Sequence, residues 1–146
     1  MLKIDVFQTK FEMRWITQNF SAGYEEGKIS IFTERTEDKK FTLIFSDFGR
    51  APKARLGSAI ASLGDLDNDG FGDFAVGAPF EDNGAGVVIL YFGRKDIEYI
   101  DKKEIIKASP GHMGFGASFS KKYMDIDNNQ LSDLAVGSYM SGRGGN

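Results

Sequence analysis

Short apolar segments alternate along the chain with turns rich in glycine and acidic residues. Lys28–Thr33 alternates polar and apolar side chains, as a half-buried strand does, whereas Gly86–Phe92 is a continuous apolar run typical of a buried strand. The pattern predicts strands at Lys28–Thr33, Phe41–Phe45, Ser58–Leu63, Phe74–Gly77, Gly86–Phe92 and Glu104–Ala108. Residues 1–22 carry no comparable motif, and we expect either a strand or an irregular segment there.

A longer pattern occurs twice. Leu56–Pro79 (LGSAIASLGDLDNDGFGDFAVGAP) and Phe115–Tyr139 (FGASFSKKYMDIDNNQLSDLAVGSY) share an early glycine, a small-residue strand, an acidic loop and a D-[FL]-A-V-G end. The first aspartates of the two loops are Asp65 and Asp125, so the repeat is 60 residues long. Four strands in about 60 residues is the content of one propeller blade. We therefore predict an all-β fold, a partial β-propeller made of four-stranded antiparallel blades.

The repeat also sets the expected boundaries. These are a divergent N-terminal segment without an assigned motif over 1–23, the end of a blade over 24–55, a blade with the first acidic loop over 56–114, and a truncated blade with the second loop over 115–146. Because propellers typically have at least four blades, we expect the chain to be a fragment of a longer protein.

Composition removes several function classes. The net charge is -3, so the chain lacks the basic footprint of a nucleic-acid-binding protein. No apolar run reaches the 18 residues of a membrane-spanning helix. Cysteine is absent, which removes disulfides and thiolate chemistry, and the single histidine, His112, lies in a turn-like stretch and is best interpreted as an exposed loop residue.

The first acidic loop has the chemistry of a cation site. Counting Asp65 as position 1, carboxylates stand at positions 1, 3, 5 and 9, namely Asp65, Asp67, Asp69 and Asp73. Alternate residues of a tight loop can direct their oxygens to one centre, and the backbone carbonyl of Phe71 at position 7 can join them. Such a shell of about six oxygens suits a hard cation, and Ca²⁺ tolerates its irregular geometry better than Mg²⁺ does. We predict a calcium-binding β-hairpin loop.

The second loop repeats this pattern with two changes. Asp125, Asp127 and Asp133 again occupy positions 1, 3 and 9, but position 5 is the neutral Asn129 and position 6 is Gln130 instead of glycine. One less negative charge and a less favourable turn both weaken cation binding. We therefore predict a second calcium site of lower affinity.

Two other interpretations of the loops were weighed. A solvated acidic turn is one of them, because Asp-Asn-Asp-Gly favours turns in its own right. An EF-hand is the other, but that loop requires a bidentate glutamate at position 12 and flanking helices. Position 12 is Val76 in the first copy and Val136 in the second, both inside apolar strands, so an EF-hand is excluded.

The two copies resemble the FG-GAP repeats of integrin α subunits. That repeat begins with Phe-Gly and ends with Gly-Ala-Pro around a D-x-D-x-D-G-x-x-D loop. Here the matching pieces are Leu56-Gly57 and Gly77-Ala78-Pro79 in the first copy, and Phe115-Gly116 and Gly137-Ser138-Tyr139 in the second. The first copy is similar to the sixth blade of the integrin α propeller and the second to the seventh, while Glu25–Phe32 looks like the end of the fifth.

The resemblance implies a calcium-binding, non-enzymatic part of a cell-adhesion receptor at the extracellular side of the plasma membrane. It implies an integrin β subunit and extracellular-matrix or cell-surface proteins as partners, and no nucleic acid. Carried over to this chain, the implied calcium ligands are Asp65, Asp67, Asp69, the Phe71 carbonyl and Asp73, and Asp125, Asp127, Asn129, the Leu131 carbonyl and Asp133.

Two other functions stay open from the sequence. FG-GAP repeats could form the accessory propeller of a secreted or surface enzyme such as a phospholipase, whose catalytic residues would lie outside this chain. The chain could also be a free-standing calcium-dependent, lectin-like binding module.

Overall fold

A computed structural model describes residues 3–9, 12–19, 25–34, 40–94, 103–120, 125–129 and 133–141. All regular structure in these ranges is β-strand, arranged in antiparallel sheets, and none is helical. In this part of the chain no helix has the length and apolar character needed to cross a membrane. The prediction of an all-β fold made of antiparallel blades is confirmed.

The first four-stranded sheet contains β1 (Lys3–Thr9), β2 (Glu12–Asn19), β3 (Lys28–Glu34) and β4 (Phe41–Phe48), hydrogen-bonded in chain order. Residues 1–22, which carry no repeat motif, thus supply two strands, and Trp15 on β2 pairs with Phe32 on β3. The two strands predicted within 24–55 are the third and fourth of this sheet. A register shift beside Ile31 keeps β4 paired to Phe48, three residues beyond its expected end.

The second sheet has the same meander order, with β5 (Ala59–Gly64), β6 (Asp73–Ala78), β7 (Val87–Tyr91) and β8 (Lys103–Lys107). The four strands predicted here are present, with boundaries displaced by one residue. Every residue of β6 is buried, as expected for a strand that has neighbours on both edges and sheets on both faces.

The second copy of the repeat forms two short ladders instead of one long sheet. β9 (His112–Met113) pairs with β12 (Met140–Ser141), and β10 (Ser118–Phe119) pairs with β11 (Val136–Gly137). β10 and β11 flank the second acidic loop just as β5 and β6 flank the first.

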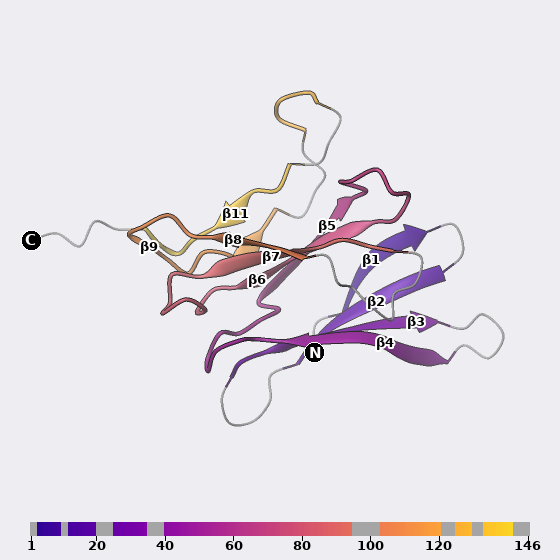
Figure 1. Cartoon of the computed structure of the whole chain (residues 1–146), viewed down its shortest axis with the longest axis horizontal. Coiled ribbons are helices and arrows are strands. Elements are labelled where there is room, and N and C mark those ends of the chain that lie inside the picture. The colour runs from indigo at the N-terminus through magenta and orange to yellow at the C-terminus, as the bar shows by residue number, and fades with distance from the viewer. Residues whose placement is uncertain are drawn as a thin grey trace, which may run out of the picture.

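Figure 1 shows the β1–β4 sheet on one side of β5–β8 and the strands of the second copy on the other. One cluster of buried side chains fills the first interface, and a second cluster fills the other. The first holds Ile29, Ile31, Leu56, Ile60, Phe74, Val76, Ala78, Val87, Ile89 and Tyr91. The second holds Leu63, Ala75 and Val88 with Leu66, Leu90, Phe115, Phe119, Leu134 and Val136. Burying each large side chain contributes roughly 1.5–3 kcal/mol, so the sheets stack as blades.

The Phe-Gly start of each repeat is the junction between blades. Leu56 N donates to Glu26 O at 2.9 Å, and Phe115 N donates to Ala85 O at 3.0 Å, 59 residues further on at both ends. The glycine that follows Leu56 also donates to the D-[FL]-A-V-G end of its own copy, and the same holds after Phe115. A Cβ on Gly77 would lie 1.9 Å from Gly116 O, so the backbones approach closely where only glycine fits.

Candidate metal centres

The first acidic loop connects β5 to β6 and folds around the side chain of Asp65. Asp65 Oδ1 accepts a hydrogen bond from Asp69 N at 3.0 Å, and Oδ2 accepts one from Gly70 N at 2.9 Å. Asn68 and Gly70 have positive φ values of 57° and 91°, which reverse the chain within the loop. The loop therefore has a defined shape supported by its own backbone donors.

Asp73 closes the loop from the first position of β6 and is fully buried. Its Oδ2 accepts a hydrogen bond from Leu66 N at 2.7 Å, and its Oδ1 accepts one from Gly93 N at 2.8 Å. Burial raises the pKa of the Asp73 carboxyl; the Gly93 and Leu66 amides lower it, and the negative charges of Asp67 and Asp69 add to the rise. A cation beside the loop would offset the desolvation and the repulsion together.

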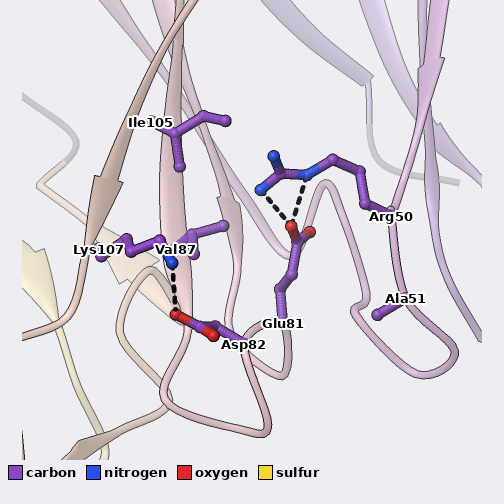
Figure 2. Close-up of a pocket in the computed structure, with 7 residues that line it drawn as sticks. All are labelled: Arg50, Ala51, Glu81, Asp82, Val87, Ile105 and Lys107. Atoms are coloured by element: carbon purple, nitrogen blue, oxygen red, sulfur yellow. Dashed lines mark hydrogen bonds and ion pairs between the residues drawn. The ribbon is translucent and has the colours of Figure 1, made fainter.

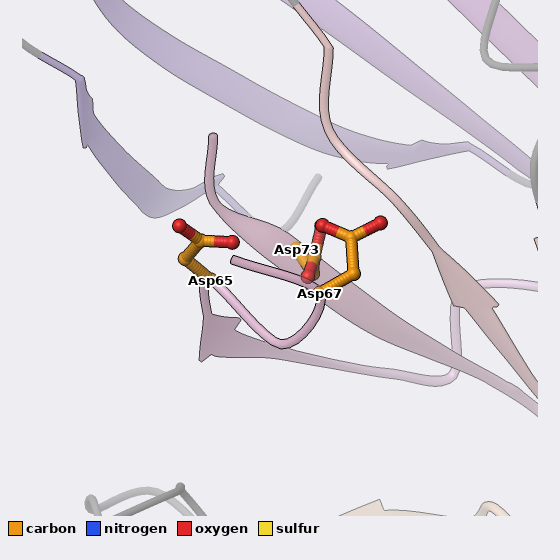
Figure 3. A group of neighbouring side chains, drawn as sticks. All are labelled: Asp65, Asp67 and Asp73. Carbon is orange, nitrogen blue, oxygen red and sulfur yellow. The ribbon is translucent and has the colours of Figure 1, made fainter. Parts of the chain in front are cut away.

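Three of the four predicted carboxylates come together. One oxygen each of Asp65, Asp67 and Asp73 lies within 4.8 Å of the other two, and Figure 3 shows the three side chains on the loop. Calcium–oxygen distances are about 2.3–2.6 Å, so two oxygens bound to one ion are separated by no more than roughly 5 Å. The set fits a hard divalent cation in size and in chemistry, because every donor is oxygen.

Asp69, the fourth carboxylate, is outside this group. Its Oδ1 accepts a hydrogen bond from Phe71 N at 2.9 Å, which holds it against the backbone of the loop. The predicted contribution of Asp69 and of the Phe71 carbonyl therefore depends on a rotation of the Asp69 side chain or on a water between it and the ion.

The second loop reproduces the frame of the first. Asp125, Asp127 and Asp133 bring one oxygen each to within 4.8 Å of the other two. Asn129 N donates to Asp125 Oδ1 at 3.0 Å, and Ile126 N donates to Asp133 Oδ2 at 2.6 Å, which correspond to the bonds made by Asp69 and Leu66.

The Asn129 side chain differs from its counterpart in the first loop. Its amide nitrogen donates to Asp127 Oδ2 at 3.0 Å, so a neutral group stabilises a carboxylate where the first loop has another carboxylate. The predicted Leu131 carbonyl lies outside the described residues, as does Gln130.

Two features near the sheets were not predicted. Gly93, 20 residues beyond Asp73, supplies a hydrogen bond to the first loop. Tyr91, which is fully buried, donates to Asp47 Oδ2 at 2.9 Å, and Lys103 Nζ donates to the same oxygen at 2.8 Å, linking the two sheets. No local sequence signal marks these contacts, because their partners are 20 to 56 residues apart.

A pocket lies between the β4–β5 connection, the β6–β7 connection and β8 (Figure 2). Two ion pairs line it: Arg50 with Glu81, whose Oε1 accepts from Arg50 Nε at 2.6 Å, and Lys107 with Asp82 at 3.1 Å. The Arg50–Glu81 pair joins the first sheet to the second. We assign these charges to the blade junction.

Comparison with known proteins agrees with this geometry. The FG-GAP repeat family matches residues 56–91, which run from the blade junction through the first acidic loop to the end of β7. The chain belongs to the FG-GAP repeat β-propeller proteins. Within that class its sequence is of the integrin α type, as three relatives show.

The chain is 36% identical over 132 residues to integrin alpha-PS2 of Drosophila melanogaster, covering 84% of this chain and 9% of that protein. It is 39% identical over 124 residues to integrin alpha-4 of Xenopus laevis, covering 80% and 12%. It is 43% identical over 90 residues to integrin alpha-3 of Mus musculus, covering 59% and 8%. The chain thus spans about a tenth of the length of the curated relatives it matches.

The relatives are integrin α subunits and not enzymes, which confirms the interpretation of this chain as non-enzymatic. Neither a phospholipase nor a lectin is among these three. The resemblance drawn from the two acidic repeats is confirmed.

Proposed function

We propose that the chain forms calcium-binding blades of the extracellular propeller of an integrin α-type adhesion receptor. The observation that carries this proposal is the repeated hairpin loop, in which three carboxylates converge between the first two strands of a blade. The same arrangement occurs twice at an interval of 60 residues, from Asp65 to Asp125, within a sequence of the integrin α type.

Calcium would be held in the first loop by Asp65, Asp67, Asp69, the Phe71 carbonyl and Asp73. In the second loop it would be held by Asp125, Asp127, Asn129, the Leu131 carbonyl and Asp133. The bound ion would supply positive charge to carboxylates that otherwise repel one another, at about 1 kcal/mol per pair in high dielectric and more when partly buried. The backbone amides already orient Asp65 and Asp73, so less conformational entropy is lost on binding.

We assign residues 24–55 to the end of one blade, 56–114 to the next and 115–146 to a third. The strands at 3–9 and 12–19 support extending the first blade back into 1–23. In the full receptor these blades would lie at the cell surface, contribute to pairing with an integrin β subunit, and take part in binding matrix or cell-surface proteins.

Calorimetric titration of the chain with Ca²⁺ tests the metal sites. We expect two binding events, of which the tighter is lost in Asp65→Asn/Asp67→Asn and the weaker in Asp125→Asn/Asp127→Asn. Glu104→Gln, an exposed change on β8, is the control for net charge and retains both. Binding that is absent, or that is equal in all four proteins, would identify the loops as solvated acidic turns.

A receptor chimaera tests the adhesive role. The matching segment of Drosophila integrin alpha-PS2 is replaced by this chain, and the chimaera is expressed with its β subunit. We expect the heterodimer at the cell surface, and a reduced amount when the chimaera carries Asp65→Asn/Asp67→Asn. A chimaera that folds but never pairs with the β subunit would contradict the proposal.

A further inference from the structure

Gly93 follows β7, the third strand of the second sheet, yet it contacts the loop between the first and second strands. Its amide donates to Asp73 Oδ1 at 2.8 Å, and Asp73 is fully buried. The other Asp73 oxygen accepts from Leu66 N within the loop. Asp73 is therefore fixed by two amides, one from the loop itself and one from the far side of the sheet.

The contact leaves no room for a side chain. A Cβ at position 93 would lie 2.3 Å from Gly72 O and 3.1 Å from Phe71 Cβ. Gly93 does not have a positive φ, so its backbone conformation is open to any residue and the contact alone requires glycine. The atoms that would be displaced belong to the peptide next to the Phe71 carbonyl and to Asp73, both assigned above to the cation.

We propose that Gly93 is a positioning residue for the first cation site, which couples the end of β7 to the geometry of the acidic loop. The inference rests on the proposed calcium binding. Gly93 would not touch the ion. Its amide would hold the Asp73 carboxylate, and its bare Cα would let the Phe71–Gly72 peptide approach. Changes to residues that orient metal ligands typically weaken metal affinity by about tenfold to a hundredfold.

The test compares two glycines that are equally tight but differently placed. Gly49 lies at the blade junction, where a Cβ would meet Glu26 O at 1.9 Å, and it makes no described contact with either acidic loop. Gly93→Ala is expected to weaken the first calcium site by about tenfold or more and to leave the second unchanged. Gly49→Ala is expected to lower the thermal unfolding temperature and leave both affinities unchanged.

A measurement on the unchanged chain keeps the test independent of how the variants fold. The amide proton resonance of Gly93 is followed by NMR during the calcium titration, and we expect it to shift in step with occupancy of the first site. A resonance that stays fixed while calcium binds would overturn the inference alone, as would equal loss of affinity in Gly49→Ala. Absence of calcium binding to the unchanged chain would overturn the proposed function and this inference together.

Discussion

Asp73 and Asp133 occupy the same position in the two copies of the repeat, but their surroundings differ. Asp73 is fully buried at the start of a six-residue strand, whereas Asp133 is half-buried and lies before a two-residue strand. Asp73 receives amides from Leu66 and Gly93, and Asp133 receives the equivalent of the first from Ile126. Among the described residues no second backbone donor to Asp133 corresponds to Gly93.

The comparison separates two contributions to a cation loop. The hydrogen bonds within the loop are the same in both copies and follow from the spacing of the aspartates. The attachment of the loop to its sheet differs, because β5–β8 is a complete four-stranded sheet packed on both faces while the second copy forms two short ladders. Similar acidic sequences are thus expected to bind calcium with different affinity, for reasons of charge and of support.

The largest expected effect comes from removing the buried carboxylate. Asp73→Asn replaces one acceptor with an amide that must face Leu66 N or Gly93 N, so a buried donor loses its partner. We expect a loss of about 1–3 kcal/mol in the free energy of unfolding, measured by urea denaturation in EDTA. Calcium binding at the first loop should also be lost.

Asp133→Asn is the matched control for this change. It should abolish the second site while the free energy of unfolding in EDTA falls by less than in Asp73→Asn, because Asp133 is only half-buried. Equal destabilisation by the two variants would mean that burial of Asp73 does not distinguish the loops.

The next effect concerns the turn at position 6. Gly70 has a φ of 91°, and Gln130 stands at that position of the second loop. A left-handed conformation costs roughly 1–2 kcal/mol for a residue with a Cβ, so Gln130→Gly should raise calcium affinity at the second site by about tenfold. Titration calorimetry measures it, and Gly70→Gln should weaken the first site in return. An unchanged second site in Gln130→Gly would show that the turn is not limiting.

A smaller effect is expected from charge at position 5. Asn129→Asp adds a fourth carboxylate to the second loop and removes the amide that donates to Asp127. One additional unit charge near the ion contributes about 1 kcal/mol in high dielectric, so affinity should rise roughly fivefold. Without calcium, the added repulsion should lower the unfolding temperature in EDTA. A rise in stability in EDTA would contradict the assigned role of Asn129.

The sequence alone predicted most of the fold, because strand and turn signals are local. The alternation in Lys28–Thr33 and the apolar run in Gly86–Phe92 correspond to β3 and β7 within one residue. Residues 3–19 were left without a motif, although their pairing with β3 makes them the first half of a sheet. A blade that has diverged from the repeat keeps its alternating pattern but loses the acidic loop by which it could be recognised.

The site divides in the same way. The spacing of Asp65, Asp67 and Asp73 led directly to the carboxylates that the structure brings together. The hydrogen bond from Gly93 could not be predicted, since it depends on how β7 lies beside β6 and not on any local pattern. Asp69 has the right spacing but accepts its hydrogen bond from the backbone, which competes with a role as ligand.

The smallest effect separates the two blade junctions. Both copies use the same backbone hydrogen bonds, but the first adds an ion pair in which Arg55 Nε donates to Glu25 Oε2 at 2.8 Å, where the second has Gly84 and Gly114. Both charged side chains are about half exposed, and exposed pairs contribute about 0.2–1 kcal/mol. Glu25→Gln should therefore lower the free energy of unfolding by that amount at low salt.

High salt gives the control for Glu25→Gln. Because the Debye length falls to about 3 Å at 1 M salt, the difference from the unchanged chain should disappear there, while both calcium affinities, measured at one salt concentration, stay the same. Arg55 also lies 5.0 Å from the centre of the Phe80 ring, a contact that Glu25→Gln leaves in place. A loss that persists in 1 M salt would mean that the junction depends on the shape of the Glu25 side chain and not on its charge, and the two junctions would then differ in packing as well as in electrostatics.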